Sequence, residues 1–591
     1  MPLTLKLELE PSDREPVDLT PEDLLELARA EAPDEDLAAA RLVRFSFDAR
    51  RRVRRWRVEL EAYGPGEPVA EPPSAPTPIA APPERAPHVV VVGSGPAGLL
   101  AALDLLAAGL RVTLLERGFD VQRRRHDLAR IHRGEAVDPD SNYCHGEGGA
   151  GTYSDGKLYT RSGAAHEVRD LLELLVAHGA PSTILADWRP HIGSNRLPKV
   201  VAALTASIRA GGGEVRFGAR AVELETEQGP DGARVTGVVL EQRSEDLGAD
   251  AAPTTGHLAC DAVVLATGHS ALDALAMARR AGARVEAKGF AMGLRIEHPQ
   301  PWLDRLQYGG LRGPCALPAA FYELVTERKG RGVYSFCMCP GGFVVPASTG
   351  PDRVVVNGMS LSRRDSPFAN SGVVVAVEPE DLCGGRGLRW GASRLLRAAG
   401  EPDGGPGRLV GAAADLVPTA ERLAEGWLPD APEDEPFVGV VVQRALELEA
   451  ARWAREAGAG PNGAPAQRAD HFAAGRGGVS EPLATSYQAG LAGVDLARLL
   501  PRGLSERLRK GLVEFDGRMA GFAGADGQVL GVESRTSSPA RLVRDPDTCE
   551  AAGLAGLFPA GEGAGHAGGI VSAALDGARV ARGVAARLGV G

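Results

Sequence analysis

The chain has 591 residues and a formal net charge of −11. Its length excludes a single hydrophobic core and predicts two to four domains, and its acidic balance argues against general affinity for nucleic acid. The chain has seven cysteines, an odd number that is small for its length, which argues against a disulfide framework. We therefore expect reduced thiols and a cytoplasmic location. The charged N-terminal residues do not resemble a secretory signal, and no apolar run reaches the roughly 18 residues that cross a bilayer, which predicts a soluble protein without a membrane partner.

Residues 1–63 predict a small α+β module. Residues 3–9 alternate as a strand, and Thr20 before a proline and two acids is typical of a helix N-cap, which predicts a helix to about residue 30. Two further strands are expected at 41–47 and 53–60. Residues 64–87 contain nine prolines and predict a semi-rigid linker, so we expect the module to move independently of the rest of the chain.

Residues 88–116 carry the most specific pattern in the chain. An apolar strand leads into Gly93-x-Gly95-x-x-Gly98, a helical pattern closes at a glycine, and a second apolar strand ends at Glu116. This is the βαβ dinucleotide-binding fingerprint in its full context. Gly93 allows the tight turn, Gly95 lets the backbone approach a pyrophosphate at the helix N-terminus, and Gly98 permits close packing. Glu116 is placed to accept the ribose hydroxyl. The residues beside these positions that we include in the nucleotide site are Pro96, Ala97 and Arg117.

A second glycine-dense segment lies at residues 146–156. Gly148, Gly149 and Gly151 would bring backbone amides close to a phosphate or flavin oxygen, with Lys157 adding charge beside them. The alternative is a flexible surface loop.

The remaining elements are expected in chain order. Helices are predicted at 167–178, at a segment that ends at Gly211–Gly213, at 441–457 and at 505–515. Strands are predicted at 235–242, 262–266, 342–346 and 353–356. The segment 122–133 is polar and rich in arginine. The C-terminal segment predicts a short strand, a glycine-rich turn and a helix from about Gly569.

Two further motifs accompany the fingerprint. A strand ends in Ala266-Thr267-Gly268, and Gly561-Glu562-Gly563 precedes the last helix. Together the three segments resemble the two-dinucleotide-binding-domain flavoproteins. The resemblance implies FAD, with the fingerprint at its ADP half and the last helix pointing its N-terminus at the flavin ring. Many members carry Asp where this chain has Glu562. The other residues that the resemblance places at the cofactor are Gly568, Gly569 and Ile570.

Longer strings narrow the resemblance. They include GEGGAGTYSDGKLYT (146–160), LATGHSALD (265–273), YSFCMCPGG (334–342), GVESRTSSPAR (531–541) and GEGAGHAGGI (561–570). They are similar to a bacterial family of FAD-dependent dehydrogenases or oxidoreductases. This resemblance implies an α/β fold: a Rossmann-like FAD-binding domain in two parts, 88–288 and 531–591, with an inserted α+β substrate or cap domain at 289–530. It implies no particular substrate.

Five residues are candidates for chemistry near the cofactor: His269, His566, Glu533, Arg535 and Lys157. Each histidine is a candidate acid or base, and a hydrogen-bonded structural role is at least as common. A buried Glu533–Arg535 pair could bind an anionic substrate or close the site; the alternative is a salt bridge that joins domains. Flavoproteins often need no protein acid, so an empty catalytic set is also open.

Cys337 and Cys339 form a C-x-C pair, and we expect a strand there to point their thiols to opposite faces. The spacing is not that of thioredoxin-like or flavin-disulfide-reductase chemistry, and no second pair completes a metal site, so we favour structural thiols and expect no metal. For Cys144 we favour a space-filling role over a thiol beside the flavin.

The last feature is a local basic patch. It consists of Arg50, Arg51, Arg52, Arg54, Arg55 and Arg57, with Trp56 among them. We favour a solvated hairpin, or one docked on the acidic core, over a nucleic-acid surface.

The pattern as a whole predicts an FAD-dependent oxidoreductase that transfers hydride between an unknown small-molecule substrate and the flavin. No second fingerprint indicates a tightly bound nicotinamide, which leaves transient NAD(P)H open. The alternatives are an RNA-modifying flavoprotein that uses the basic patch and a non-catalytic flavin-binding sensor.

Overall fold

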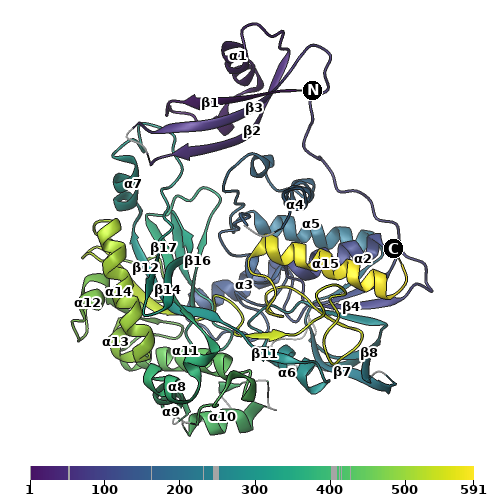
Figure 1. Ribbon diagram of the computed structural model, residues 1–591, viewed down its shortest axis with the longest axis vertical. Helices are drawn as coiled ribbons and strands as arrows, with labels where there is room; N and C mark the ends of the chain where they lie inside the picture. Colours follow the sequence, from purple (N-terminus) through teal and green to yellow (C-terminus); the bar gives the residue numbers. More distant parts are fainter. Residues whose placement is uncertain are drawn as a thin grey trace.

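The computed structural model describes residues 2–50, 53–160, 163–230, 232–243, 252–400, 409–410, 413, 416–425 and 427–590. Helices and parallel and antiparallel sheets make up an α/β architecture (Figure 1). Within this described part of the chain, no helix is both long and apolar enough to cross a membrane.

The N-terminal module is a three-stranded antiparallel sheet in the order β1-β3-β2 with one helix against it. Its elements are β1 (Leu3–Leu9), α1 (Pro21–Glu31), β2 (Ala39–Asp48) and β3 (Arg55–Tyr63). Thr20 caps α1, because its hydroxyl accepts a hydrogen bond from the Asp23 amide at 3.2 Å. Figure 1 shows this module at one end of the molecule, with the linker running down one side to β4.

The module is docked rather than free. The Phe45 amide donates to the Ala186 carbonyl at 3.0 Å, and the Trp188 amide donates to the Phe45 carbonyl at 3.1 Å. On the other side, the Phe47 ring meets Tyr308 edge-on, with centroids 5.4 Å apart. The linker composition alone predicts independent motion, but these contacts tie the module to two separate parts of the core.

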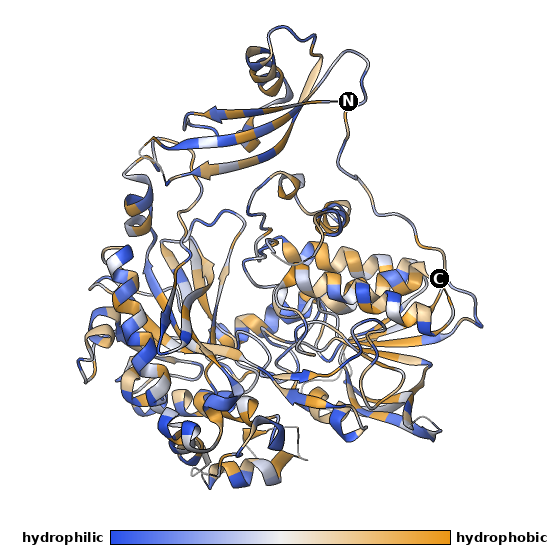
Figure 2. Cartoon of the chain, in the orientation of Figure 1, coloured by the Kyte–Doolittle hydropathy of each residue, from blue (hydrophilic) through white to orange (hydrophobic). Residues whose placement is uncertain are grey.

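The nucleotide-binding part is built on a parallel five-stranded sheet in the order β22-β10-β4-β5-β6. Its strands are β4 (His88–Val92), β5 (Arg111–Leu115), β6 (Glu214–Arg216), β10 (Ala262–Leu265) and β22 (Leu557–Pro559). Its helices include α2 (Pro96–Ala107), α4 (Ala165–Ala177), α5 (Leu197–Ala210) and α15 (Ile570–Arg587). These four helices stack together above the sheet in Figure 1, and the strands below them are mostly apolar in Figure 2. The antiparallel ribbon β7 (Ala219–Gly229), β8 (Gly232–Gln242) and β9 (Thr254–Ala259), and α6 (Leu272–Arg280), complete this part.

The second large part is a mixed seven-stranded sheet in the order β13-β14-β17-β12-β20-β18-β19. Its strands are β12 (Phe290–Pro299), β13 (Val325–Arg328), β14 (Arg331–Cys339), β17 (Phe368–Val377), β18 (Ala464–Arg468), β19 (Leu491–Gly493) and β20 (Gln528–Glu533). Its helices are α7 (Gln300–Tyr308), α8 (Gly384–Trp390), α9 (Ala392–Gly400), α10 (Val417–Ala424), α11 (Val438–Glu456), α12 (Ala469–Ala474), α13 (Leu496–Leu499) and α14 (Arg502–Arg518). The boundary expected at residue 530 falls inside β20, which pairs with β12 and β18 in this sheet.

Two small sheets join the parts: β11 (Val285–Ala287) with β21 (Ala540–Leu542), and β15 (Gly342–Pro346) with β16 (Val356–Ser360). The strand expected at 353–356 is displaced, since β16 begins at Val356. The reason is that the Val354 amide donates to the Glu447 carbonyl of α11 at 3.1 Å. The arginine-rich segment is the helix α3 (Val121–His132), capped by the Asp120 carboxylate.

Candidate functional site

Each of the three fingerprint positions is glycine for a different structural reason. Gly93 has a φ of +103°, and a Cβ there would clash with the Ala266 carbonyl. A Cβ on Gly98 would clash with the Gly93 carbonyl, so helix and strand can pack only because that position is glycine. Gly95 is the N-cap of α2, and a Cβ there would meet nothing within 4 Å. The amide-rich end of α2 therefore faces open space, which suits a pyrophosphate.

The three motifs that lie far apart in the sequence meet at one edge of the parallel sheet. A Cβ on Gly561 would stand 2.9 Å from the Cβ of Ala97, and one on Gly563 would clash with the Gly268 carbonyl. Ala266, the first residue after β10, already packs against Gly93. The residues Ala266, Thr267 and Gly268 thus lie between the fingerprint and the C-terminal motif.

The glycine-dense segment covers this edge. A Cβ on Gly149 would stand 3.2 Å from the Gly95 Cα, and one on Gly151 would stand 3.1 Å from the Ile570 Cγ1 atom. Gly148 and Gly149 have φ values of 78° and 64°, which favour glycine. The segment therefore touches the N-termini of both α2 and α15 and is not a free surface loop. Gly569 caps α15 and, like Gly95, would place a Cβ in open space, with Gly568 and Glu562 beside it.

Glu116 ties the glycine-dense segment to the fingerprint. Its Oε2 accepts hydrogen bonds from the amide and the hydroxyl of Ser94 at 3.0 and 2.8 Å. Its Oε1 accepts from the amides of Gly118 and Gly146 at 2.9 and 3.0 Å. Burial opposes the charge, but these hydrogen bonds hold the pKa of Glu116 below its usual value. Protein donors thus engage both oxygens, and a contact between Glu116 and a ribose stays a prediction.

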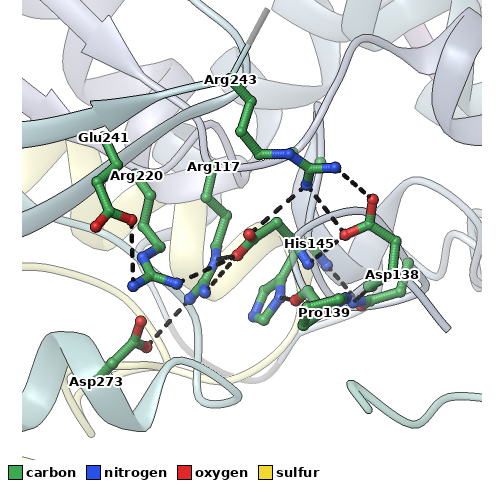
Figure 3. Close-up of polar contacts among 12 residues, drawn as sticks. Arg117, Asp138, Pro139, His145, Arg220, Glu241, Arg243 and Asp273 are labelled. Atoms are coloured by element: carbon green, nitrogen blue, oxygen red, sulfur yellow. Dashed lines mark hydrogen bonds and ion pairs between the residues drawn. The ribbon is translucent and has the colours of Figure 1, made fainter. Parts of the chain in front are cut away.

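Arg117 lies in a network of buried charges (Figure 3). Its guanidinium donates to Asp140 at 2.8 Å and to Asp273 at 3.1 Å. Figure 3 also shows His145, whose Nδ1 lies 2.9 Å from the Pro139 carbonyl. Burial and the charge of Arg117 lower the pKa of His145 to about 3, so this imidazole is neutral. A contact between Arg117 and the cofactor stays a prediction.

A small pocket, with a volume of about 40 Å³, lies between the glycine-dense segment and the second part of the molecule. Residues of four separate segments line it: Cys144, Ala150, Tyr153, His269, Asn357 and Arg535. His269 also lies 3.4 Å from Glu562, measured from Nδ1 to Oε1. The structure therefore brings two of the five candidates, His269 and Arg535, to one pocket beside the nucleotide-binding edge.

His566 is not among the residues that line this pocket. Its Nε2 lies 2.8 Å from the Leu542 carbonyl. Burial, followed by the charge of Arg544, lowers the pKa of His566 to about 4. A neutral imidazole that is hydrogen-bonded to the backbone fits a structural role for His566 better than the role of a catalytic acid.

Glu533 and Arg535 each have a different partner. Glu533 accepts from Arg295 at 2.7 Å, and both side chains are within 1% of complete burial. Burial raises the pKa of Glu533 to about 7, although Arg295 opposes that shift. Arg535 binds Glu447 of α11 at 2.6 Å. The expected Glu533–Arg535 pair is therefore wrong. Glu533 is the last residue of β20 and pairs with Arg295 of β12, whereas Arg535 lies beyond the strand and pairs with Glu447 of α11.

Two further arginines, Arg353 and Arg444, lie near Arg535. Burial, then the charges of Arg353 and Arg535, lower the pKa of Arg444 to about 9. Glu447 is the carboxylate beside all three arginines, and it has no exposed side-chain surface. Arg353 also binds Asp352 at 3.1 Å. The sequence predicts nothing of this cluster, since Arg353, Arg444 and Arg535 come from segments about 90 residues apart along the chain, as their numbers show.

Lys157 meets the two cysteines of the C-x-C pair. Its Nζ lies 3.8 Å from both the Cys337 and the Cys339 sulfur. The expectation that these thiols point to opposite faces is wrong, because side chains alternate along a strand and residues two apart share a face. Among the described residues, no group of three or more His, Cys, Asp or Glu side chains is arranged to hold a metal ion.

The basic patch is largely engaged within the protein. Arg50 and Arg57 both bind Asp48 at 3.0 Å, and Arg55 binds Glu10 at 2.6 Å. Arg54 donates to the Gln307 carbonyl at 2.9 Å, and Trp56 is 2% exposed. Arg51 and Arg52 lie outside the described residues. The contact of Arg54 reaches the core, whereas those of Arg50, Arg55 and Arg57 stay within the N-terminal module.

Comparisons with known proteins agree with this arrangement. Residues 88–126 match an FAD binding domain, and residues 289–392 and 420–536 match the family described as "FAD-dependent protein, C-terminal domain-like". A protein of Clostridium beijerinckii is 36% identical over 497 residues, which cover 83% of this chain and 79% of that one.

Solved structures show a looser likeness. The FAD complex of glycerol-3-phosphate dehydrogenase from Bacillus halodurans is 15% identical over 50% of this chain and 48% of that one, with a TM-score of 0.26. Mycobacterium smegmatis Sdh1 in complex with UQ1 is 16% identical over 85% of this chain and 69% of that one, with a TM-score of 0.29. Likeness at this level carries no argument about activity.

The family match and the relative show the kind of protein. FAD is its cofactor, and the glycines at the edge of the parallel sheet fit that group because they leave the ends of α2 and α15 open. This chain belongs to the family of FAD-dependent proteins that share this C-terminal domain, and it is an FAD-dependent oxidoreductase.

Proposed function

We propose that this protein is a dehydrogenase that transfers hydride between an anionic small-molecule substrate and the flavin. The observation that carries the proposal is the pocket lined by Ala150, His269 and Arg535. It adjoins the glycine-dense segment on one side and the cluster of Arg353, Arg444 and Arg535 on the other. Arg535 is the arginine among the residues that line the pocket, so an anion entering there would meet its guanidinium group.

The residues of the chain have separate tasks in this proposal. The end of α2 at Gly95 and the motif around Gly561 and Glu562 would hold the nucleotide, with the glycine-dense segment closing over it. The N-terminus of α15 at Gly569 would favour negative charge near its end. Arg535 would orient a carboxylate of the substrate, and His269, next to Glu562, is the group placed to hold or move a proton. When bound, FAD supplies the two-electron acceptor or donor.

The experiment is an anaerobic spectrum of the purified holoprotein between about 300 and 600 nm, recorded before and after NADH, NADPH and a panel of small carboxylates and their neutral esters. Bleaching by a carboxylate but not by its ester supports a dehydrogenase of anionic substrates. Bleaching by a nicotinamide alone would assign the reductant and move the search to an anionic acceptor. A yellow protein that no donor reduces would contradict the proposal and favour a non-catalytic flavin-binding sensor.

An RNA-directed function is a weaker candidate. It would use the basic patch as a landing surface, but Arg50, Arg54, Arg55 and Arg57 already bind protein groups. Copurification of RNA that high salt removes would favour it.

A further inference from the structure

A cysteine pair next to the pocket is arranged for chemistry that hydride transfer does not use. Cys337 is a non-glycine residue with a φ of 45°, and the pairing of β14 with β17 shifts register between Phe336 and Cys339. Two steps along a regular strand span about 6.6 Å, the upper end of the roughly 4.4–6.8 Å that separates the Cα atoms of a disulfide. The Cys339 thiol lies 3.4 Å from the Cys337 carbonyl, so its side chain folds back toward its neighbour.

Positive charge surrounds the two sulfur atoms. Lys157 Nζ lies 3.8 Å from each sulfur, and Arg295 Nη2 lies 3.9 Å from the Cys339 sulfur while donating to the Cys337 carbonyl at 2.8 Å. The neighbouring Cys339 side chain and the charges of Lys157 and Arg295 lower the pKa of Cys337 well below its usual value, although burial opposes that shift. The neighbouring Cys337 side chain and burial raise the pKa of Cys339.

The acids that face this cluster are already paired. Asp155 lies 3.6 Å from Lys157 and 2.5 Å from Arg364, and its hydrogen bond with Ser360 fixes it further. Glu533 is paired with Arg295. Burial and the charge of Arg364 lower the pKa of His191, the remaining ring near Asp155, to about 4. Lys157 therefore lies between the Asp155 carboxylate and the two sulfur atoms.

The pair can be reached and it adjoins the pocket. The Lys157 side chain is 35% exposed and Cys337 is half-buried, whereas Cys339 is fully buried. Arg295 Nη1 lies 3.5 Å from the Oδ1 atom of Asn357, and Asn357 lines the same pocket as His269 and Arg535. Lys157 itself follows directly on the glycine-dense segment that covers Gly95. One shell of residues therefore separates the sulfur atoms from the pocket.

We propose that Cys337 and Cys339 are a second redox centre of this flavoprotein, a dithiol that closes to an intramolecular disulfide and exchanges two electrons with the flavin. The Cys337 thiolate and the Cys339 sulfur form the S–S bond, and the S–H bond of Cys339 breaks. Two electrons and that proton pass to oxidised FAD, which becomes its reduced anion, so that charge and atoms balance. Run in reverse, reduced flavin regenerates the dithiol. The class of partner that such a centre serves is a thiol or disulfide compound.

The first experiment does not involve flavin turnover. Protein stripped of FAD is treated with diamide or with dithiothreitol and then alkylated with iodoacetamide. It is digested with trypsin, and the peptides are analysed by mass spectrometry. The tryptic fragment 332–353 contains no other cysteine. We expect diamide to protect both thiols as an internal disulfide, and in reduced protein we expect Cys337 to be alkylated at pH 6, more than about tenfold faster than Cys260. Lys157→Met should remove most of that rate advantage. Full alkylation of both thiols after diamide would overturn the proposal.

The second experiment counts electrons in the holoprotein by anaerobic dithionite titration. This proposal rests on FAD binding but not on hydride transfer to a substrate. We expect the wild-type protein to take up about four electrons per FAD, and Cys337→Ser and Cys339→Ser to take up about two. Cys260→Ser, which removes a half-buried thiol elsewhere, is the matched control and should keep the wild-type count. Two electrons in wild-type protein with an intact disulfide in the first experiment would exclude exchange with the flavin. Failure of every substrate to bleach the flavin would refute the proposed dehydrogenase and leave these counts unchanged.

Discussion

Gly95 and Gly149 face one another across the nucleotide-binding edge: a Cβ on Gly149 would stand 3.2 Å from the Gly95 Cα, whereas a Cβ on Gly95 would meet nothing within 4 Å. Protein atoms therefore leave little room for a side chain at Gly149, whereas Gly95 borders the open space that we assign to the pyrophosphate. This asymmetry separates the glycines needed for folding from those needed for binding.

We expect Gly95→Val to fold and to lose FAD. Gly95 has a φ of −69°, which valine accepts, and its side chain would enter the space at the end of α2. The ratio of flavin to protein absorbance after purification should fall at least about tenfold, with an unchanged far-UV spectrum. Gly460→Val, at an exposed glycine that also has open surroundings, is the control and should retain full flavin. Full flavin in Gly95→Val would place the pyrophosphate elsewhere.

Glu447→Gln should destabilise the protein strongly. The Glu447 side chain has no exposed surface, and removing its charge leaves the buried guanidinium of Arg535 without its carboxylate. Breaking a buried pair of this kind costs about 3–5 kcal/mol. Urea unfolding measures the loss. Glu456→Gln, in the same helix and 60% exposed, should cost less than about 1 kcal/mol. Equal effects of the two substitutions would contradict the burial argument.

His566 should contribute to loss of stability in acid. Its pKa is lowered to about 4 in the folded protein, so the unfolded chain binds the proton first as the pH falls below about 6.5. The stabilisation is complete above that pH and declines by about 2 kcal/mol between pH 8 and pH 5. His566→Gln keeps a donor for the Leu542 carbonyl but does not titrate, and its stability should depend less on pH. Parallel pH profiles for the two proteins would show that folding does not lower the pKa of His566.

Phe47→Ala should release the N-terminal module. The substitution removes the edge-on contact with Tyr308 and a second ring contact with Trp56, whose centroid lies 5.0 Å away. For a half-buried ring we expect a loss of about 2 kcal/mol and faster proteolysis within the linker, residues 64–87. Val53→Ala, at a side chain that is 58% exposed, should leave the cleavage rate unchanged. An unchanged rate in Phe47→Ala would mean that other contacts, such as the backbone hydrogen bonds of Phe45 and the bond from Arg54 to Gln307, hold the module.

Local patterns predicted the nucleotide-binding part well. The turn at Gly93, the helix from Pro96 and the strand before Glu116 are encoded in consecutive residues, because glycine spacing and apolar runs act over a few positions. The same holds for the Thr20 cap. The resemblance to flavoproteins supplied what local patterns could not, namely that the motifs at Ala266 and Gly561 join the fingerprint.

Only the tertiary structure decided which charged groups meet. Glu533 and Arg535 lie two residues apart, yet one pairs with Arg295 in a neighbouring strand and the other with Glu447 in α11. Lys157 reaches Cys337 across 180 residues of sequence. Backbone preferences are local and can be read from neighbours along the chain, whereas buried charges are stabilised only by partners that packing brings within a few ångströms. The sequence by itself therefore determined the cofactor and the frame that holds it, and the packing of the two large sheets decided the pocket, its arginines and the cysteine pair.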